Sequence, residues 1–261
     1  MYIKAYHGRI QNSPLWAGLD ASIYGCVKGL LNAHGYSLLP QVGHIFKSVS
    51  AHTAPAEFVR ELASFPLPEI DSRLQEGLKA ANSLPWLSTG GQASRWDCAI
   101  IYAIASILQP RRIIETGTGI GATGYCALRG AQDAHLYTFD MERGGAGVDG
   151  VPYKRWGDLP RGGVGQFITE DMADRVSFIM GDIRDTLPAW VDAQHEGFKF
   201  ERPDLVILDS AHTPEHQAFE ANLLLPLIKS GSVMLCDDTT YGWSRFAKSY
   251  LNCGFLGGLR K

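Results

Sequence analysis

Short apolar runs alternate with stretches of helical spacing from about residue 93 to the end of the sequence. The runs are rich in Val, Ile, Leu, Phe and Tyr, and each is far enough from the next to leave room for a crossover helix. Such alternation predicts an α/β protein built on a doubly wound, mainly parallel sheet. The expected strands are residues 112–116, 135–140, 176–180, 204–209 and 232–237.

Residues 1–90 show no strand alternation. The pattern predicts helices over residues 53–65 and 69–82, and a further helix that begins at Ser13-Pro14. The apolar faces of these helices need a partner to cover them, so we expect residues 1–90 to form a helical cap on an α/β domain of residues 91–261. The α/β domain opens with a helix at residues 95–108, which Gln109-Pro110 ends.

Composition narrows the class of protein. The hydrophobic fraction is 45%, the charged fraction is 20% and the formal net charge is −3, which argues against a nucleic-acid binder that relies on overall charge. No apolar run approaches the roughly 20 residues of a membrane span. The five cysteines form no CxxC pair. We therefore expect a reduced, cytoplasmic protein; the sequence leaves open whether it is a homo-oligomer.

A glycine-rich loop at residues 116–121 follows the first predicted strand and opens a helix. Gly117, Gly119 and Gly121 allow a sharp turn and a close approach of the backbone to a ligand. Asp140 ends the next strand, where an acid can hold two ribose hydroxyls. These features suit both a dinucleotide and S-adenosylmethionine. Glu115 favours the second, because it would repel a pyrophosphate but can hold an ammonium group, directly or through water.

Three carboxylates follow the fourth and fifth predicted strands: Asp209, Asp237 and Asp238. Ends of neighbouring parallel strands face one crevice, and three acids there repel each other unless a cation holds them. Oxygen ligands suit Mg²⁺. A capping role for Asp209 is less favoured, because Thr213-Pro214 supplies a cap for the next helix.

Two histidines lie close to these acids in the sequence. His212 can act as a general base beside a metal, as a hydrogen-bonding neighbour or as a solvated side chain, and these readings stay open. His216 is expected on the surface of the following helix.

The assembled motifs resemble the metal-dependent O-methyltransferases of the Rossmann-like class, from residue 92 to the end of the sequence. Residues 115–121 are similar to the first motif of that class, Asp140 to its ribose acid, and Gly181-Asp182 to its third motif, whose acid lies near the adenine amino group. The segments 203–209, 225–231 and 233–239 resemble its block of fourth and fifth strands. The cofactor-binding residues implied are Glu115, Thr116, Gly117, Gly119, Gly121, Asp140, Met141, Asp182 and Asp209.

The resemblance implies methyl transfer from S-adenosylmethionine to a hydroxyl oxygen of a small-molecule acceptor. Catechol and caffeoyl-CoA O-methyltransferases place metal ligands at positions matching Asp209, Asp237 and Asp238, with a lysine base where this chain has His212. The arrangement of Asp209 and His212 together with Asp237-Asp238 is closer to that of the sugar O-methyltransferases of macrolide pathways and their cephalosporin-pathway relatives. His212 and Asp209 are thus the catalytic candidates. The alternatives are a metal-independent N- or C-methyltransferase, a nicotinamide-dependent oxidoreductase and a non-catalytic protein with this fold.

Two regions have less readable roles. Residues 144–165 hold eight glycines in 22 residues, which indicates a lid or a disordered segment. Candidate acceptor contacts are Trp96, Tyr153, Trp156 and Trp243. After Asp238 we expect one helix, residues 243–252, and one strand, residues 254–260, so that the last sheet edge is abbreviated or completed by a partner chain.

Overall fold

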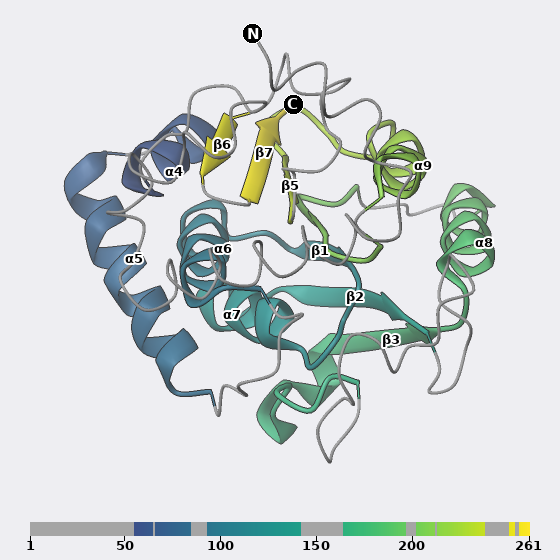
Figure 1. Cartoon of the computed structure of the whole chain (residues 1–261), viewed down its shortest axis with the longest axis horizontal. Coiled ribbons are helices and arrows are strands. Elements are labelled where there is room, and N and C mark those ends of the chain that lie inside the picture. The colour runs from purple at the N-terminus through teal and green to yellow at the C-terminus, as the bar shows by residue number, and fades with distance from the viewer. Residues whose placement is uncertain are drawn as a thin grey trace, which may run out of the picture.

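A seven-stranded sheet runs through the middle of the computed structural model, with the strand order β3-β2-β1-β4-β5-β7-β6 (Figure 1). The structure describes residues 55–64, 66–84, 93–141, 164–196, 202–211, 213–237, 251–253 and 256–261. The strands are β1 (Arg112–Thr116), β2 (His135–Asp140), β3 (Val176–Met180), β4 (Leu205–Leu208), β5 (Val233–Cys236), β6 (Leu251–Cys253) and β7 (Leu256–Arg260).

The first five strands confirm the predicted parallel, doubly wound sheet. β1, β2 and β3 have the predicted bounds, and β4 and β5 are each one residue shorter at both ends. At the last edge, the predicted strand 254–260 is confirmed as β7, which begins two residues later, whereas the prediction of a helix through residue 252 and of an abbreviated edge is wrong. Residues 251 and 252 belong to β6, which pairs antiparallel with β7, and β7 pairs antiparallel with β5. The chain therefore completes this edge itself; residues 238–250 lie outside the described part.

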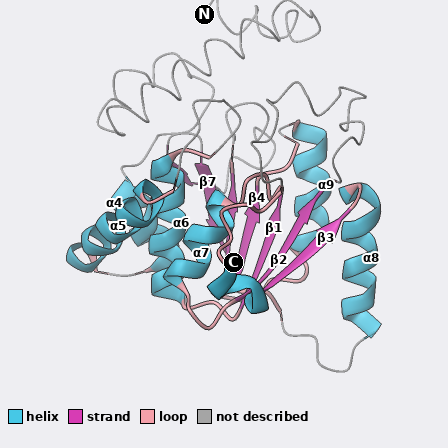
Figure 2. Cartoon of the chain, turned by 90° about the horizontal axis from the view of Figure 1, so that it is seen from below, coloured by secondary structure: helices cyan, strands magenta, loops and turns pink. Residues whose placement is uncertain are grey.

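Helices cover both faces of the sheet (Figure 2). One face carries α4 (Pro55–Ala63), α5 (Leu67–Asn82), α6 (Arg95–Leu108) and α7 (Ala122–Gly130), and the other carries α8 (Ile183–Glu196) and α9 (Pro214–Leu224). A short 3₁₀ helix, η3 (Glu170–Arg175), precedes β3. Strand side chains alternate between two cores: Ile113 belongs to the first and Ile114 to the second, as the two-residue period of a strand requires.

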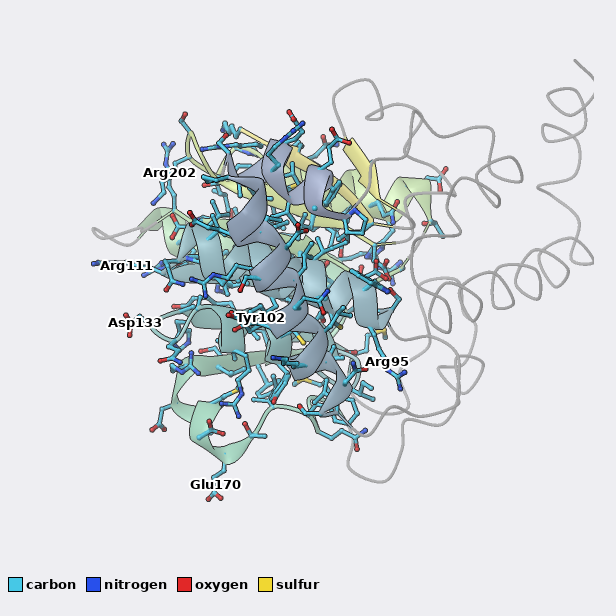
Figure 3. The ribbon with its side chains drawn as sticks, turned by 90° about the vertical axis from the view of Figure 1, so that its left-hand side faces the viewer. Arg95, Tyr102, Arg111, Asp133, Glu170 and Arg202 are labelled. Atoms are coloured by element: carbon cyan, nitrogen blue, oxygen red, sulfur yellow. The ribbon has the colours of Figure 1, made fainter. Side chains whose placement is uncertain are left out.

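The described helices of residues 55–84 pack on the α/β layer. Tyr102 on α6 donates a hydrogen bond to Glu76 on α5, and a Cβ at Gly77 would lie 2.7 Å from the carbonyl oxygen of Ala99. Figure 3 shows Tyr102 midway along α6, between Arg95 and Arg111 near its two ends. The predicted need of these helices for a covering partner is thus met by α6. The predicted boundary near residue 90 falls outside the described residues, as do residues 1–54.

The bounds of α6 follow from its capping chemistry. Ser94 and Asp97 form a capping box in which each side chain accepts a hydrogen bond from the backbone N–H of the other residue. Gln109, in the left-handed conformation with φ of 45°, ends the helix where the sequence predicted. None of the helices in the described ranges is long and apolar enough to cross a membrane.

Candidate active site

The glycine loop joins β1 to α7 with three residues in the left-handed region. Gly117, Gly119 and Gly121 have φ values of 83°, 49° and 86°, which glycine adopts without a steric penalty. A Cβ at Gly117 would lie 1.9 Å from the carbonyl oxygen of Asp209, so the loop packs directly against the end of β4. A Cβ at Gly119 would meet no atom of the described residues within 4 Å. The loop is therefore packed at Gly117 and open at Gly119, as a backbone cradle for a ligand requires.

Asp140 lies across from the open side of this loop. Its Oδ2 accepts a 2.7 Å hydrogen bond from the N–H of Gly119, and its Oδ1 accepts a 2.6 Å bond from the N–H of Met141. The residue is only 8% exposed. Each carboxylate oxygen has a second lone pair, so Asp140 can also accept hydroxyl donors at the loop. This geometry fits the predicted ribose contact, which remains a prediction, as does packing of the half-buried Met141 on an adenine ring.

Glu115 is buried between β1, β2 and α7. Its carboxyl is fully buried and accepts hydrogen bonds from Thr123 Oγ1 at 2.5 Å and Thr138 Oγ1 at 2.6 Å. The absence of a side chain at Gly124 leaves room for it, since a Cβ there would lie 3.1 Å from Glu115 Oε2. Burial raises the pKa of Glu115 to about 7, against the opposing effect of the two threonine hydrogen bonds.

The predicted direct contact of Glu115 with an ammonium group stays a prediction. In the structure the side chain ties β1 to β2 and α7 through both of its carboxylate oxygens. Thr123 and Thr138 are not among the site residues predicted from the sequence. A signal was present at Thr138, a polar residue in an otherwise mostly apolar strand, which the sheet places in register with Glu115. The water-mediated contact stays a prediction.

Thr116 ends β1 beside the crevice and is fully buried. Its carbonyl oxygen accepts a 2.8 Å hydrogen bond from the N–H of Asp209. Its hydroxyl is buried and has no hydrogen-bond partner among the described residues. A buried hydroxyl without a partner is costly, and its place beside the glycine cradle fits a ligand contact.

Asp182 lies between β3 and α8. Its carboxylate accepts hydrogen bonds from the N–H of Arg184 at 2.9 Å and from the Arg184 guanidinium, which lower the pKa of Asp182 to about 2. The sequence analysis did not foresee Arg184. The predicted role of Asp182 near an adenine amino group is not tested by this contact, since a carboxylate can accept several donors at once.

Asp209 and Asp237 lie side by side at the ends of β4 and β5. Leu208 and Cys236 are register partners, and the N–H of Asp237 donates a 2.8 Å hydrogen bond to the carbonyl of Leu208. Two carboxylates on neighbouring strands form a set of hard oxygen donors, which suits Mg²⁺. No group of three potential ligands occurs in the described part of the chain. Asp238 and His212 lie outside it, so the metal set stays a prediction.

The start of α9 confirms one prediction and corrects another. Thr213 is the N-cap, and its hydroxyl accepts a 3.3 Å hydrogen bond from the N–H of His216. His216 is not on the surface, because it is only 4% exposed and its Nε2 lies 3.3 Å from Oε1 of Glu220. The local pattern is misleading here, since polar residues along one helix ordinarily indicate its solvated face.

The other predicted contacts fall mostly outside the described residues. Tyr153, Trp156 and Trp243 are among these, and Trp96 packs partly buried against the core. The described end of the glycine-rich segment contacts the cradle: the N–H of Gly165 donates a 2.9 Å hydrogen bond to the carbonyl of Gly119.

The sheet arranges the predicted site residues in one row. Asp182, Asp140, the glycine loop, Asp209 and Asp237 follow β3, β2, β1, β4 and β5, which are consecutive in the sheet. With neighbouring strands about 4.8 Å apart, the row spans roughly 19 Å. One extended ligand and a second, smaller group can therefore lie side by side along it.

Comparisons with known proteins extend this picture. Residues 114–239 match the model of a family described as a methyltransferase domain. A search of curated proteins found no match. Among solved structures, the chain is similar to the Podospora anserina methyltransferase PaMTH1 bound to SAH, with 19% identity, a TM-score of 0.42, and coverage of 64% of this chain and 62% of that one.

Two further structures are similar. The Streptomyces achromogenes O-methyltransferase TomG, involved in tomaymycin synthesis and complexed with SAM, has 21% identity, coverage of 64% and 66%, and a TM-score of 0.40. A Bacillus cereus O-methyltransferase in complex with SAH has 16% identity, coverage of 73% and 91%, and a TM-score of 0.44. The chain thus spans under two thirds of the length of PaMTH1 and TomG.

The family match covers the glycine loop, the Asp140 strand and both acid-bearing strands. These are the elements that the sheet brings to one edge. Residues 114–239 therefore match a methyltransferase domain, and they lie on a doubly wound sheet of Rossmann-like architecture.

Proposed function

We propose that the chain is an S-adenosylmethionine-dependent methyltransferase that acts on a hydroxyl oxygen of a small molecule, with a divalent cation at Asp209, Asp237 and Asp238. The observation that carries the proposal is the register of β4 and β5, which puts Asp209 and Asp237 next to each other, with Asp209 one strand from the glycine loop. A formal charge of −3 gives no overall attraction for a nucleic acid, which supports a small acceptor.

Residues at different strand ends along the sheet edge have different roles in the proposed reaction. The glycine loop and Asp140 hold and orient the cofactor, which supplies a methyl group on a positively charged sulfur. Asp209, Asp237 and Asp238 would hold the cation, which would supply Lewis-acid chemistry and favour loss of the acceptor's hydroxyl proton. His212 would accept that proton. Fixing acceptor and cofactor in one crevice contributes the alignment that such a transfer needs.

The sheet order argues against the nicotinamide alternative. The usual dinucleotide-binding sheet has the order 3-2-1-4-5-6. Here the antiparallel strand β7 lies between β5 and β6. The adjacent acids Asp209 and Asp237 also have no task in hydride transfer between a nicotinamide and a substrate. A metal-independent methyltransferase likewise leaves this pair without a role.

The test compares metal binding with cofactor binding in the full chain. Asp237→Asn is measured beside Asp192→Asn, a matched change at an exposed residue of α8. We expect Asp237→Asn to lose most of its affinity for Mn²⁺, followed by the paramagnetic signal of the free ion, and to keep its calorimetric affinity for S-adenosylhomocysteine. Asp192→Asn should match the wild type in both. Unchanged Mn²⁺ binding in Asp237→Asn would contradict the metal site.

A further inference from the structure

The inner face of α9 carries a buried polar cluster that the proposed mechanism does not use. We propose that Gln217 and Glu220 are positioning residues that fix the separation of Asp209 and Asp237, so that the two acids can share one cation. The inference rests on the proposed function, because it needs a metal site to position. It concerns residues that neither touch the cofactor loop nor carry the metal.

Glu220 holds the end of β4. Its side chain is fully buried, and its Oε1 accepts a 2.5 Å hydrogen bond from the hydroxyl of Ser210. Ser210 directly follows Asp209, so this bond fixes the chain one residue beyond the proposed metal ligand. His216, one turn earlier on α9, keeps its Nε2 3.3 Å from the same Glu220 oxygen. Glu220 therefore lies between its own helix and the β4 end, and its hydrogen bond from Ser210 is the contact that joins the two.

Gln217 holds the end of β5. Its Nε2 donates a 3.1 Å hydrogen bond to the backbone carbonyl of Asp237, and the side chain is only 4% exposed. The bond again acts at the backbone and leaves the carboxylate of Asp237 to other contacts. Gln217 and Glu220 are three residues apart, so they lie on one face of the helix. A single helix, α9, therefore makes hydrogen bonds to the end of β4, beside Asp209, and to the end of β5, at Asp237.

The strand ladder alone does not set this geometry. In the described part of the chain, the hydrogen bond from Asp237 N–H to the carbonyl of Leu208 is the last one between the ends of β4 and β5. The placement of side chains beyond it depends on other contacts. The affinity of a protein for a metal ion depends strongly on the neighbouring groups that orient the ligand side chains. The hydrogen bonds of Glu220 and Gln217 act on residues just beyond the paired parts of β4 and β5.

The energetics favour positioning over stabilisation. Burying a carboxylate is costly, and replacing a buried ionic group by an apolar one of similar size is often neutral or stabilising. The cluster is also incompletely satisfied, since Glu220 Oε2 and Gln217 Oε1 are buried without a hydrogen-bond partner in the described part of the chain. A partly satisfied network is a poor stabiliser. Its place beside two metal-ligand candidates therefore points to a geometric role.

Gln217→Leu separates the two roles. The carbonyl of Asp237 keeps a second donor, the thiol of Cys236 at 3.3 Å, so the substitution leaves no backbone acceptor without a partner. We expect a melting temperature equal to or above that of the wild type. Mn²⁺ affinity should fall by roughly 10- to 100-fold, the usual effect of losing a residue that orients metal ligands. If Gln217 had a purely structural role, the substitution would lower the melting temperature and leave the Mn²⁺ affinity unchanged.

The experiment titrates Mn²⁺ into the full chain saturated with S-adenosylhomocysteine, for the wild type, Gln217→Leu, Ser210→Ala and the control Asn222→Ala on the exposed side of α9. Weaker Mn²⁺ binding in the first two variants, with S-adenosylhomocysteine affinity within about twofold of wild type, supports the inference. Ser210→Ala removes only one hydroxyl and decides the matter if Gln217→Leu fails to fold.

Two results overturn it in distinguishable ways. Wild-type Mn²⁺ affinity in Gln217→Leu and Ser210→Ala refutes the positioning role and leaves the proposed metal site standing. Absence of Mn²⁺ binding by the folded wild type refutes the metal site itself, and the positioning role with it. Equal weakening in Asn222→Ala refutes the positioning role, because that residue lies away from both acid-bearing ends.

Discussion

The backbone N–H of Gly119 donates a 2.7 Å hydrogen bond to Oδ2 of Asp140, which joins the glycine loop to the end of β2. The two residues are 21 positions apart in the sequence and belong to neighbouring strand ends. This bond fixes the carboxylate at the open side of the loop, where no atom of the described residues lies within 4 Å of the position of a Cβ on Gly119. The loop and Asp140 therefore form one hydrogen-bonded unit.

Asp140→Ala should weaken binding of S-adenosylhomocysteine at least tenfold. The change removes the predicted ribose contact and the acceptor of two backbone N–H groups, those of Gly119 and Met141. Calorimetric titration measures the loss. Asp133→Ala, in the exposed turn before β2, is the control and should bind normally. Wild-type affinity in Asp140→Ala would show that the carboxylate does not contact the cofactor.

Gly119→Ala should fold and lose cofactor binding. The left-handed conformation costs a side chain about 1–2 kcal/mol, and the new methyl group occupies the open side of the loop. Gly231→Ala is a matched control, because Gly231 also has positive φ and open surroundings but lies away from the crevice. It should show a similar fall in melting temperature with normal S-adenosylhomocysteine binding. Equal affinity in both variants would contradict the cradle.

Gly117→Ala should behave differently from Gly119→Ala. Its Cβ would lie 1.9 Å from the carbonyl oxygen of Asp209, so the ends of β1 and β4 would have to separate. We expect a loss of about 3 kcal/mol or more in the free energy of unfolding, from overpacking and backbone strain together. Urea denaturation measures it. A stability equal to that of Gly119→Ala would contradict this packing.

Glu115 should make stability depend on pH. Its pKa in the folded protein, about 7, is above the ordinary value of 4.5, so the folded state holds the proton more tightly. The stability it contributes is fully present below pH 4.5 and is lost as pH rises through 7. The difference corresponds to about 3 kcal/mol.

Glu115→Gln tests this dependence. The amide keeps hydrogen-bonding groups near Thr123 and Thr138 but does not titrate. Urea denaturation of both proteins between pH 5 and pH 8 should show the wild type losing stability relative to Glu115→Gln as pH rises. Parallel curves across this range would mean that Glu115 does not change its charge there.

Asp182 should discriminate at the adenine amino group. A site that accepts a hydrogen bond rejects a ligand lacking the donor, so the wild type should prefer S-adenosylhomocysteine to its inosine analogue, in which an oxygen replaces that amino group. Asp182→Ala should lose this preference. Arg184→Ala, which removes only the guanidinium bonds to Asp182, should retain it. If Asp182→Ala discriminates as well as the wild type, the carboxylate does not contact the adenine.

Much of the fold follows from local sequence. β1, β2 and β3 are predicted to the residue because short runs rich in Ile, Val, Leu, Phe and Tyr, bounded by turn residues, indicate strand bounds directly. The end of α6 at Gln109 and the cap at Thr213 are equally local signals. The site residues on strand ends follow from topology, since parallel strands bring their carboxyl ends to one edge.

The missed features depend on contacts between elements. Glu115 is held in place because Thr123 and Thr138 donate hydrogen bonds to it from α7 and β2. The buried positions of His216 and Glu220 depend on the β4 end packing over α9. Residues 251–252 form a strand because β7 offers them an edge to pair with. Single-chain periodicity does not encode such pairings.

The measurement that tests the central claim most directly is a calorimetric titration of the full chain with S-adenosylmethionine and with S-adenosylhomocysteine, in buffer containing Mg²⁺. We predict one site per chain with micromolar affinity for both ligands. No detectable heat or binding, with a folded protein shown by cooperative unfolding, would contradict the assignment of the crevice as a cofactor site.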